Sequence, residues 1–286
     1  MQRGKGLNGD GFIQRGGAIL RYRTEGEGQP LLVIGSSAYY PPVFSRSLRS
    51  SLELIFVDLR HFSESDDETG SIAPTLEDYT GDIEAFRQYL ALDSVIILGH
   101  SHHGNLAIEY ARRFPQYVSA VVLVGTPPAN VAETLDESAD YWQRHANARR
   151  RSLLQSRRAM LSSDNADFIS RYVADAPMYW YDPEYDAGWL WRDVPVNGRV
   201  LEAFKQFFVD YDFSASAADL SMPVLAVVGC HDYIVPPTLW RQGKKRFSDL
   251  TFHCLDRCGH TPPLEVPEQF DGVLLKWVSQ ISANAK

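Results

Sequence analysis

The chain has 286 residues, of which 44% are hydrophobic and 22% are charged. This composition is typical of globular proteins and excludes a disordered or collagen-like chain. The formal net charge of −8 repels phosphate backbones, so we expect no nucleic acid among the partners.

Membrane insertion and secretion are not expected from the sequence. No apolar run approaches the roughly 20 residues of a membrane span, and residues 1–11 lack the apolar core of a signal peptide. The three cysteines, an odd and sparse number, argue against a disulfide framework and favour a reducing, cytoplasmic location.

Short apolar segments alternate with helical patterns, which predicts β/α units around a mostly parallel sheet. Continuous runs of Val, Ile and Leu are typical of strands that helices cover on both faces. We expect strands at residues 31–34, 54–57, 95–98, 120–124, 224–228 and 251–255.

Two helices can be placed between these strands. The first begins at Thr75, where Asp78 completes a capping box, and apolar side chains recur at helical spacing as far as Leu90. The second follows Gly104 and Asn105. Its predicted buried stripe consists of Leu106, Ala107, Tyr110, Ala111 and Phe114.

The pattern changes in residues 128–217, where no strand-like run occurs and aromatic residues are frequent. We interpret this segment as a mainly helical cap, inserted between the two parts of one core, residues 1–127 and 218–286. Most of its aromatic side chains are expected to pack a small core of the cap itself, because aromatic residues usually serve burial.

A serine follows the predicted strand at 95–98, where residues 99–104 read GHSHHG. On a sharp turn between a buried strand and a helix, the Ser101 hydroxyl would stand above the sheet edge. The helix then directs N–H groups and its dipole at developing negative charge, and Gly99 lets the turn close. We therefore predict that Ser101 is a nucleophile rather than a turn serine that caps a helix.

Two clusters raise the alternative of a metal site. His100, His102 and His103 resemble part of the metallo-β-lactamase signature His-x-His-x-Asp-His, but the aspartate is missing and the spacing is too short. His253 and Cys254 are adjacent in a predicted strand and point to opposite faces, so they do not share an ion. We expect no metal, and interpret Cys254 as a core residue and His253 as a surface residue.

A nucleophilic serine needs a base, and the base needs an orienting acid. Asp232 follows the strand at 224–228 and His260 follows the strand at 251–255. Sites of open α/β sheets form outside the carboxyl ends of the strands, so these side chains and Ser101 should meet on one rim. We predict that His260 takes the proton of Ser101 and that Asp232 orients His260.

A tetrahedral intermediate also needs two backbone N–H donors. The residue after the nucleophile, His102, supplies one. The loop after the strand at 31–34 supplies the other, and we favour Ser36, with Ser37 one register away, because small residues allow close backbone approach. Tyr39 and Tyr40 either line the acyl pocket or merely cover this loop.

With these residues the chain resembles the α/β-hydrolase superfamily over nearly its full length. The matching segments are 12–28, 31–36, 58–65, 99–104, 229–232 and 259–260. The resemblance implies an eight-stranded, mostly parallel sheet with helices on both faces and a cap after the sixth strand, at 120–124. It also implies a Ser101-His260-Asp232 triad and no cofactor.

Within the superfamily, segments 232–237 and 258–262 and the acidic, aromatic cap resemble the proline iminopeptidase-like branch. Cap carboxylates would there hold the ammonium group of a substrate. Ile34 precedes Gly35, however, where the family usually has histidine, and Ser36-Ser37-Ala38 replaces the Gly-Gly-Pro-Gly of iminopeptidases, which weakens the case for aminopeptidase specificity.

His103 stands where the family has a small residue, and a bulky side chain there should crowd the elbow. We expect Gly104 to absorb the bend. We further expect His103 to be buried and to pack or hydrogen-bond behind the elbow, where it would reshape the pocket.

The sequence thus predicts a serine hydrolase, a monomer or small homo-oligomer, that cleaves a small ester or amide through an acyl-enzyme intermediate. Its expected partner is a small-molecule substrate. Two alternatives keep the same residues: a ligand-binding or signalling protein with slow turnover, and an enzyme of C–C bond hydrolysis or cofactor-free oxygen chemistry. Ester, aminoacyl-amide and diketone substrates would distinguish them.

Overall fold

The computed structural model describes residues 9–65, 73–161 and 167–284. Residues 1–8, which belong to the segment without a signal-peptide pattern, lie outside the described residues. Within the described ranges, no helix is both long enough and apolar enough to cross a membrane.

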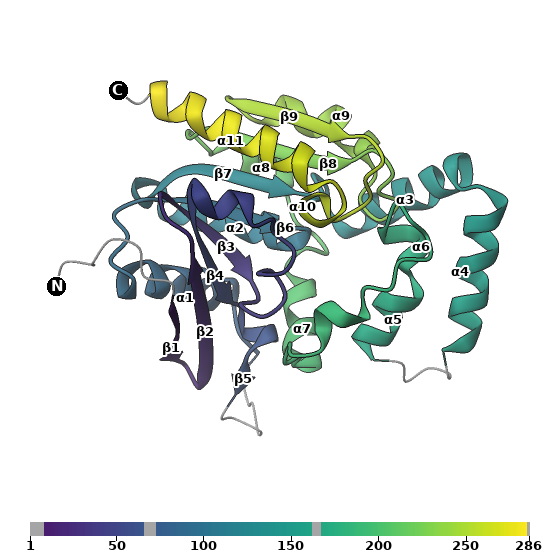
Figure 1. The fold of residues 1–286 in the computed structure, drawn as a ribbon, viewed down its shortest axis with the longest axis horizontal. Coiled ribbons are helices and arrows are strands. Elements are labelled where there is room, and N and C mark those ends of the chain that lie inside the picture. The colour runs from purple at the N-terminus through teal and green to yellow at the C-terminus, as the bar shows by residue number, and fades with distance from the viewer. Residues whose placement is uncertain (1–8, 66–72, 162–166, 285–286) are drawn as a thin grey trace.

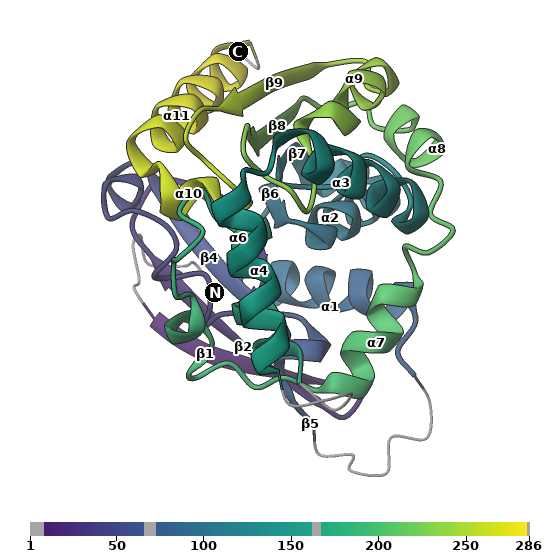
Figure 2. The ribbon, with the colours of Figure 1, turned by 90° about the vertical axis from the view of Figure 1, so that its right-hand side faces the viewer.

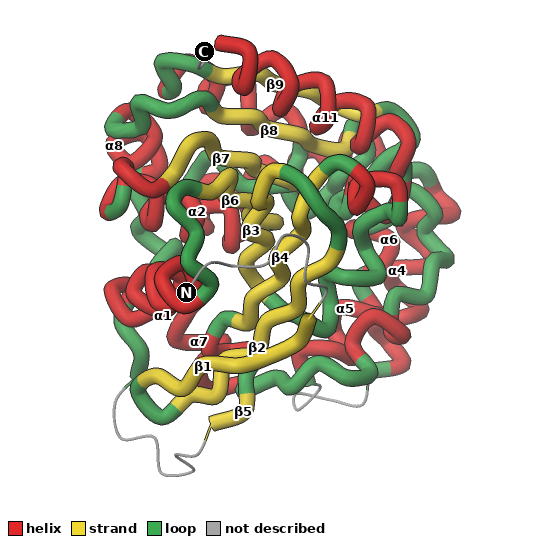
Figure 3. Tube along the Cα trace, turned by 60° about the vertical axis from the view of Figure 1, so that its left-hand side comes forward, coloured by secondary structure: helices red, strands yellow, loops and turns green. Residues whose placement is uncertain are grey.

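A single sheet organises the described chain, with strands in the order β1-β2-β4-β3-β6-β7-β8-β9, and the short β5 pairs with β2 (Figure 3). Pairs β1–β2 and β2–β4 are antiparallel, and all pairs from β4 to β9 along this order are parallel. The predicted eight-stranded, mostly parallel sheet is confirmed. The strands are β1 (Gly9–Arg15), β2 (Ala18–Glu25), β3 (Gln29–Gly35), β4 (Leu52–Asp58), β5 (Glu64–Ser65), β6 (Val95–His100), β7 (Val118–Val124), β8 (Val224–Gly229) and β9 (Leu250–Leu255).

The two faces of the sheet form two apolar clusters, because successive residues of a strand point in opposite directions. In β3, Leu32 and Ile34 belong to one cluster and Leu31 and Val33 to the other, and all four are fully buried. Helices α1 (Leu76–Tyr89) and α2 (His102–Arg113) cover the first face, and α11 (Pro267–Asn284) covers the second (Figure 1).

The predicted capping box at the start of α1 is present. The Thr75 hydroxyl accepts the Asp78 N–H (3.2 Å), and the Asp78 carboxylate accepts the Thr75 N–H (2.9 Å). Helix α2 begins at His102, two residues before Gly104, because the turn after β6 leads directly into the helix.

Between β7 and β8 the described chain forms helices and no strand. Figures 1 and 2 show α4, α5 and α6 on the side of the sheet where the parallel strands end. The predicted cap limits, residues 128–217, remain a prediction. The helices here are α3 (Val131–His145), α4 (Ala148–Met160), α5 (Phe168–Ala174), α6 (Ala176–Tyr179), α7 (Gly198–Gln206) and α8 (Phe213–Ala218), with a 3₁₀ turn at Gly188–Trp191.

The aromatic side chains of this segment correct one expectation. They largely join the two clusters of the sheet rather than a core of their own: Tyr172 and Trp191 pack in the α11-side cluster, and Phe204 and Phe208 in the α1–α2 cluster. The segments that carry or adjoin these rings, α5, the 3₁₀ turn at Gly188–Trp191 and α7, are short, and their rings are buried against the core beneath them.

The cysteines correct a second expectation, since Cys230 and Cys254 form a disulfide with Cα atoms 5.5 Å apart. Cys230 directly follows β8, and Cys254 lies in the adjacent β9, opposite Val228. The pairing is a consequence of strand order, which a cysteine count does not reveal. Cys258 is free and buried.

Candidate active site

Ser101 lies on the turn between β6 and α2 with φ 56° and ψ −136°. A positive φ is strained for a residue that carries a side chain and is typical of a nucleophile elbow. The Ser101 N–H donates to the Val124 carbonyl of β7 (2.8 Å), and the Ser101 carbonyl accepts the Gly104 N–H (2.9 Å). The strained turn is therefore held from both sides.

The two glycines of the elbow leave no room for a side chain. A Cβ atom on Gly99 would lie 2.3 Å from the His103 carbonyl oxygen, and one on Gly104 would lie 1.9 Å from Thr126 Oγ1. Close approach of the helix to its own strand and to the end of β7 thus requires both residues.

Asp232 and His260 meet directly beyond the carboxyl ends of β8 and β9. His260 Nδ1 lies 2.6 Å from Asp232 Oδ2, and both side chains are almost completely buried. Asp232 Oδ1 accepts the N–H groups of Ile234 and Val235, each at 2.9 Å. With Nδ1–H donated to the carboxylate, Nε2 of His260 is left to accept a proton.

The backbone of His260 is fixed on both sides. Its N–H donates to the Tyr179 carbonyl (2.6 Å), and its carbonyl accepts a hydrogen bond from His100 Nε2 (2.9 Å). The catalytic candidate is therefore tied to the segment between β7 and β8 as well as to the core.

Glu265, at the end of α10 (Pro262–Glu265), is a site residue that sequence reasoning missed. Its carboxylate accepts the N–H groups of Gly259 (2.9 Å), Thr261 (2.9 Å) and Tyr181 (2.8 Å), and so fixes the loop on both sides of His260. Burial raises its pKa. An acidic residue four positions after Thr261, in the first turn of a helix, was the available signal.

A cavity of about 410 Å³ lies over the elbow, lined by Ser101, His260, His102, Tyr39 and Tyr40. Both tyrosines thus face the cavity, and Tyr39 Oη lies 3.2 Å from Tyr172 Oη. The segment between β7 and β8 supplies most of the remaining aromatic wall, which includes Phe168, Tyr172, Tyr179, Trp191 and Phe204.

The loop after β3 distinguishes its two candidate donors. The Ser37 N–H donates to Asp58 Oδ1 (2.6 Å) and is occupied. Among the described residues, the N–H groups of Ser36 and His102 donate in none of the loop and turn hydrogen bonds, so both remain candidate donors to an oxyanion. Asp58, a second residue that sequence reasoning missed, is buried, and burial raises its pKa to about 6.

His103 is half-buried in the wall of the cavity rather than fully buried behind the elbow, and its ring stacks on His61 and contacts Phe204. Its Nδ1 lies 3.2 Å from Tyr40 Oη and its Nε2 lies 3.1 Å from His61 Nε2. Burial lowers the pKa of His103 well below its usual value. Among the described residues, no group of three or more His, Cys, Asp or Glu side chains could hold a metal ion.

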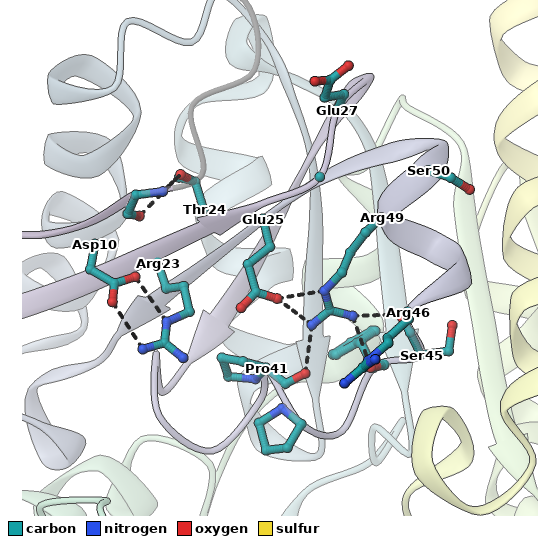
Figure 4. Close-up of a pocket in the computed structure, with 14 residues that line it drawn as sticks. Asp10, Arg23, Thr24, Glu25, Glu27, Pro41, Ser45, Arg46, Arg49 and Ser50 are labelled. Atoms are coloured by element: carbon teal, nitrogen blue, oxygen red, sulfur yellow. Dashed lines mark hydrogen bonds and ion pairs between the residues drawn. The ribbon is translucent and has the colours of Figure 1, made fainter.

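A larger, open pocket of about 1280 Å³ lies beside β2 and the loop after β3 (Figure 4). Its charged groups are largely paired with one another: Arg23 with Asp10 (3.0 Å) and Arg49 with Glu25 (2.6 Å). None of the predicted catalytic residues lines it, so this pocket is separate from the chemistry predicted above.

The alpha/beta hydrolase fold family model matches residues 33–267. The chain belongs to the α/β-hydrolase family. This hydrolase is 34% identical over 278 residues to the AB hydrolase superfamily protein YclE of Bacillus subtilis (strain 168), covering 94% of this chain and 99% of the relative.

Two further proteins are similar to this α/β hydrolase. The proline iminopeptidase PfmaB of Pestalotiopsis fici (strain W106-1 / CGMCC3.15140) is 25% identical over 273 residues, covering 89% of this chain and 94% of the relative. The crystal structure of VinJ superposes with a TM-score of 0.75 at 17% identity, covering 96% and 99% of the two chains. The resemblance to a proline iminopeptidase-like branch agrees with the similarity to PfmaB.

Proposed function

We propose that this α/β hydrolase is a serine esterase that cleaves small, uncharged esters with an apolar or aromatic acyl group. The observation that carries the proposal is the 2.6 Å hydrogen bond between His260 and Asp232, behind a cavity wall that contains both His260 and the strained Ser101. A base that is oriented by an acid and that lines the same cavity as a serine is the arrangement that acyl transfer needs.

In the proposed reaction, Ser101 Oγ attacks the ester carbonyl while its proton passes to His260 Nε2. The oxyanion accepts hydrogen bonds from the N–H groups of Ser36 and His102. His260 then returns the proton to the departing alcohol oxygen, and the C–O bond breaks to leave an acyl-serine. Water, deprotonated by His260, attacks this ester, and the acid leaves as Ser101 regains its proton.

The charges of the cavity favour an uncharged ester over an aminoacyl substrate. Among the described residues that line the cavity, the one carboxylate is Asp175, and Arg158 Nε already binds it at 2.6 Å. The other cation of the wall, Lys205, pairs with Glu202 at 2.6 Å. A substrate ammonium group would therefore have to break an existing ion pair, whereas the rings of the wall suit an apolar group.

The first test is labelling with a fluorophosphonate probe, which reacts with an activated serine. We expect rapid labelling of the native protein and of the control Ser119→Ala, whose hydroxyl bonds Val95 in the sheet away from the cavity, and none of Ser101→Ala. Absence of labelling of the folded native protein would refute the proposed nucleophile.

Substrate class is tested with matched p-nitrophenyl esters, aminoacyl p-nitroanilides and diketones. We expect the esters of apolar and aromatic acids to be turned over fastest. Preferential cleavage of aminoacyl anilides or of diketones would replace the esterase assignment with an aminopeptidase or C–C hydrolase.

A further inference from the structure

Beside the elbow, and partly in the wall of the cavity, polar side chains from four separate segments form an unbroken row of hydrogen bonds that ends on the backbone of His260. We call this row the histidine–tyrosine chain. Its successive contacts are Tyr79 Oη to His61 Nδ1 (3.1 Å), His61 Nε2 to His103 Nε2 (3.1 Å), His103 Nδ1 to Tyr40 Oη (3.2 Å), Tyr40 Oη to His100 Nδ1 (3.3 Å) and His100 Nε2 to the His260 carbonyl (2.9 Å).

The end at His260 determines where the first hydrogens lie. A carbonyl oxygen only accepts, so His100 must carry its hydrogen on Nε2. In a neutral imidazole the other nitrogen then has a free lone pair, so His100 Nδ1 accepts the hydroxyl hydrogen of Tyr40. Tyr40 has no second hydrogen to donate, and its oxygen must accept from His103.

The same argument assigns the hydrogens at the other end of the chain, toward Tyr79. His103 donates from Nδ1, so its Nε2 accepts and His61 must donate from Nε2. His61 Nδ1 then accepts the hydroxyl hydrogen of Tyr79. With all three rings neutral, this is the one arrangement of hydrogens that satisfies every contact.

The surroundings favour the neutral rings that this count requires. Burial lowers the pKa of both His61 and His100 to about 3, with Lys205 adding to the effect at His61 and His260 adding to it at His100. A proton added to His103 would place two N–H donors, on His103 Nε2 and His61 Nε2, face to face, at a cost that burial increases.

We propose that the histidine–tyrosine chain positions His260 for catalysis by fixing the ring of His100 through its Nδ1, so that His100 Nε2–H anchors the His260 backbone. The inference rests on the proposed hydrolase function of His260. Asp232 fixes the ring of His260 and Tyr179 fixes its N–H, and the chain supplies the third anchor, at the carbonyl. His103, which replaces a small residue of the family pattern, is the link that makes the row continuous.

The chain predicts a spectroscopic signature in the native protein. In long-range ¹H–¹⁵N correlation spectra at neutral pH, with signals assigned by single histidine substitutions, we expect His61 and His100 as Nε2–H tautomers. His103 should be the less common Nδ1–H tautomer. Rapid averaging between tautomers, or a different tautomer at any of the three, would overturn the proposed chain without requiring any variant to fold.

The functional half of the proposal is tested with Tyr40→Phe, which deletes the hydroxyl that joins His100 to His103. We expect kcat for an ester to fall about tenfold, because small displacements of a catalytic group are costly, while KM changes by less than about twofold. The tautomers of His103 and His61 should no longer be fixed. The matched control is Tyr110→Phe, which loses a buried hydroxyl bonded to Glu84 (2.9 Å) outside the chain.

Two outcomes separate the chain from the proposed function. If Tyr40→Phe retains the kcat of Tyr110→Phe, the chain does not position His260, even though the fluorophosphonate probe still labels Ser101. If the probe labels neither the native protein nor Tyr40→Phe while the three tautomers of the native protein are as predicted, the chain exists but the proposed hydrolase chemistry is wrong.

Discussion

Acid should destabilise this protein through its buried neutral histidines, and His61 allows the effect to be isolated. In the unfolded chain a histidine takes up a proton below a pKa of about 6.5, whereas burial keeps folded His61 neutral down to about 3. The unfolded state therefore binds more protons as the pH falls through this window. The stability that neutral His61 contributes is present above about pH 6.5 and is lost progressively below it.

The magnitude follows from proton linkage. Between about pH 7.5 and about pH 5.5, one such histidine lowers the free energy of unfolding by about 1.4 kcal/mol. His100, with the same lowered pKa, adds about as much, so the two together remove about 3 kcal/mol of a total that is typically about 5–15 kcal/mol. The pKa of Asp58 is raised to about 6, so Asp58 acts in the opposite direction. It adds about 1 kcal/mol to the free energy of unfolding over the same pH interval.

Urea unfolding at the two pH values measures this effect in native protein, His61→Gln and His145→Gln. Between the two pH values, the free energy of unfolding of the native protein should fall by about 1.4 kcal/mol more than that of His61→Gln. This comparison does not depend on how far the two proteins differ in stability at neutral pH. His145 is exposed, so His145→Gln should lose as much as the native protein. Equal losses in native protein and His61→Gln would show that folded His61 is not held neutral.

Three further predictions concern the loop, the elbow and the thiols. Glu265→Gln should destabilise the protein by about 2 kcal/mol in urea unfolding, because the amide cannot accept all three N–H groups, and should lower ester kcat; an unchanged kcat would separate Glu265 from catalysis. Gly104→Ala places a methyl group against Thr126 and should lower the free energy of unfolding by about 3 kcal/mol or more, as measured by thermal or urea unfolding. The control is Gly198→Ala, where a Cβ atom would have nothing within 4 Å, and stability should change by less than about 1 kcal/mol. Similar stabilities of the two variants would contradict the close packing of the elbow. Iodoacetamide should alkylate one cysteine, Cys258, in protein unfolded without reductant and three after reduction, as counted by mass spectrometry; three before reduction would exclude the disulfide.

The fold was predictable where one physical signal dominated a local segment. Strands β3, β4, β6, β7 and β8 are internal and apolar for most of their length, and α1 begins at a capping box, so these features could be placed from residue order alone. The two-residue β5 has no such run. The disulfide between Cys230 and Cys254 depends on strand order, and the packing of the cap aromatics depends on which surface lies beneath them.

The candidate site divides in the same way. Ser101, Asp232 and His260 each follow a recognisable strand, and their chain order is that of α/β hydrolases. Asp58 acts through hydrogen bonds to backbone N–H groups that the sequence does not mark, whereas Glu265 was marked only by its place in the first turn of a helix. His61 meets His103 only because the segment after β4 lies next to the start of α2, and no local pattern predicts that contact.

The backbone between Tyr179 and Tyr181 has a consequence for how this enzyme can diversify. The Tyr179 carbonyl holds the N–H of His260, and the Tyr181 N–H holds Glu265. A chimera that received this whole segment from a relative would have to reproduce both main-chain contacts, or it would lose the alignment of its base together with its old substrate. New specificities should therefore arise by exchange of side chains on the cavity wall, while the course of the main chain through residues 179–181 is inherited unchanged.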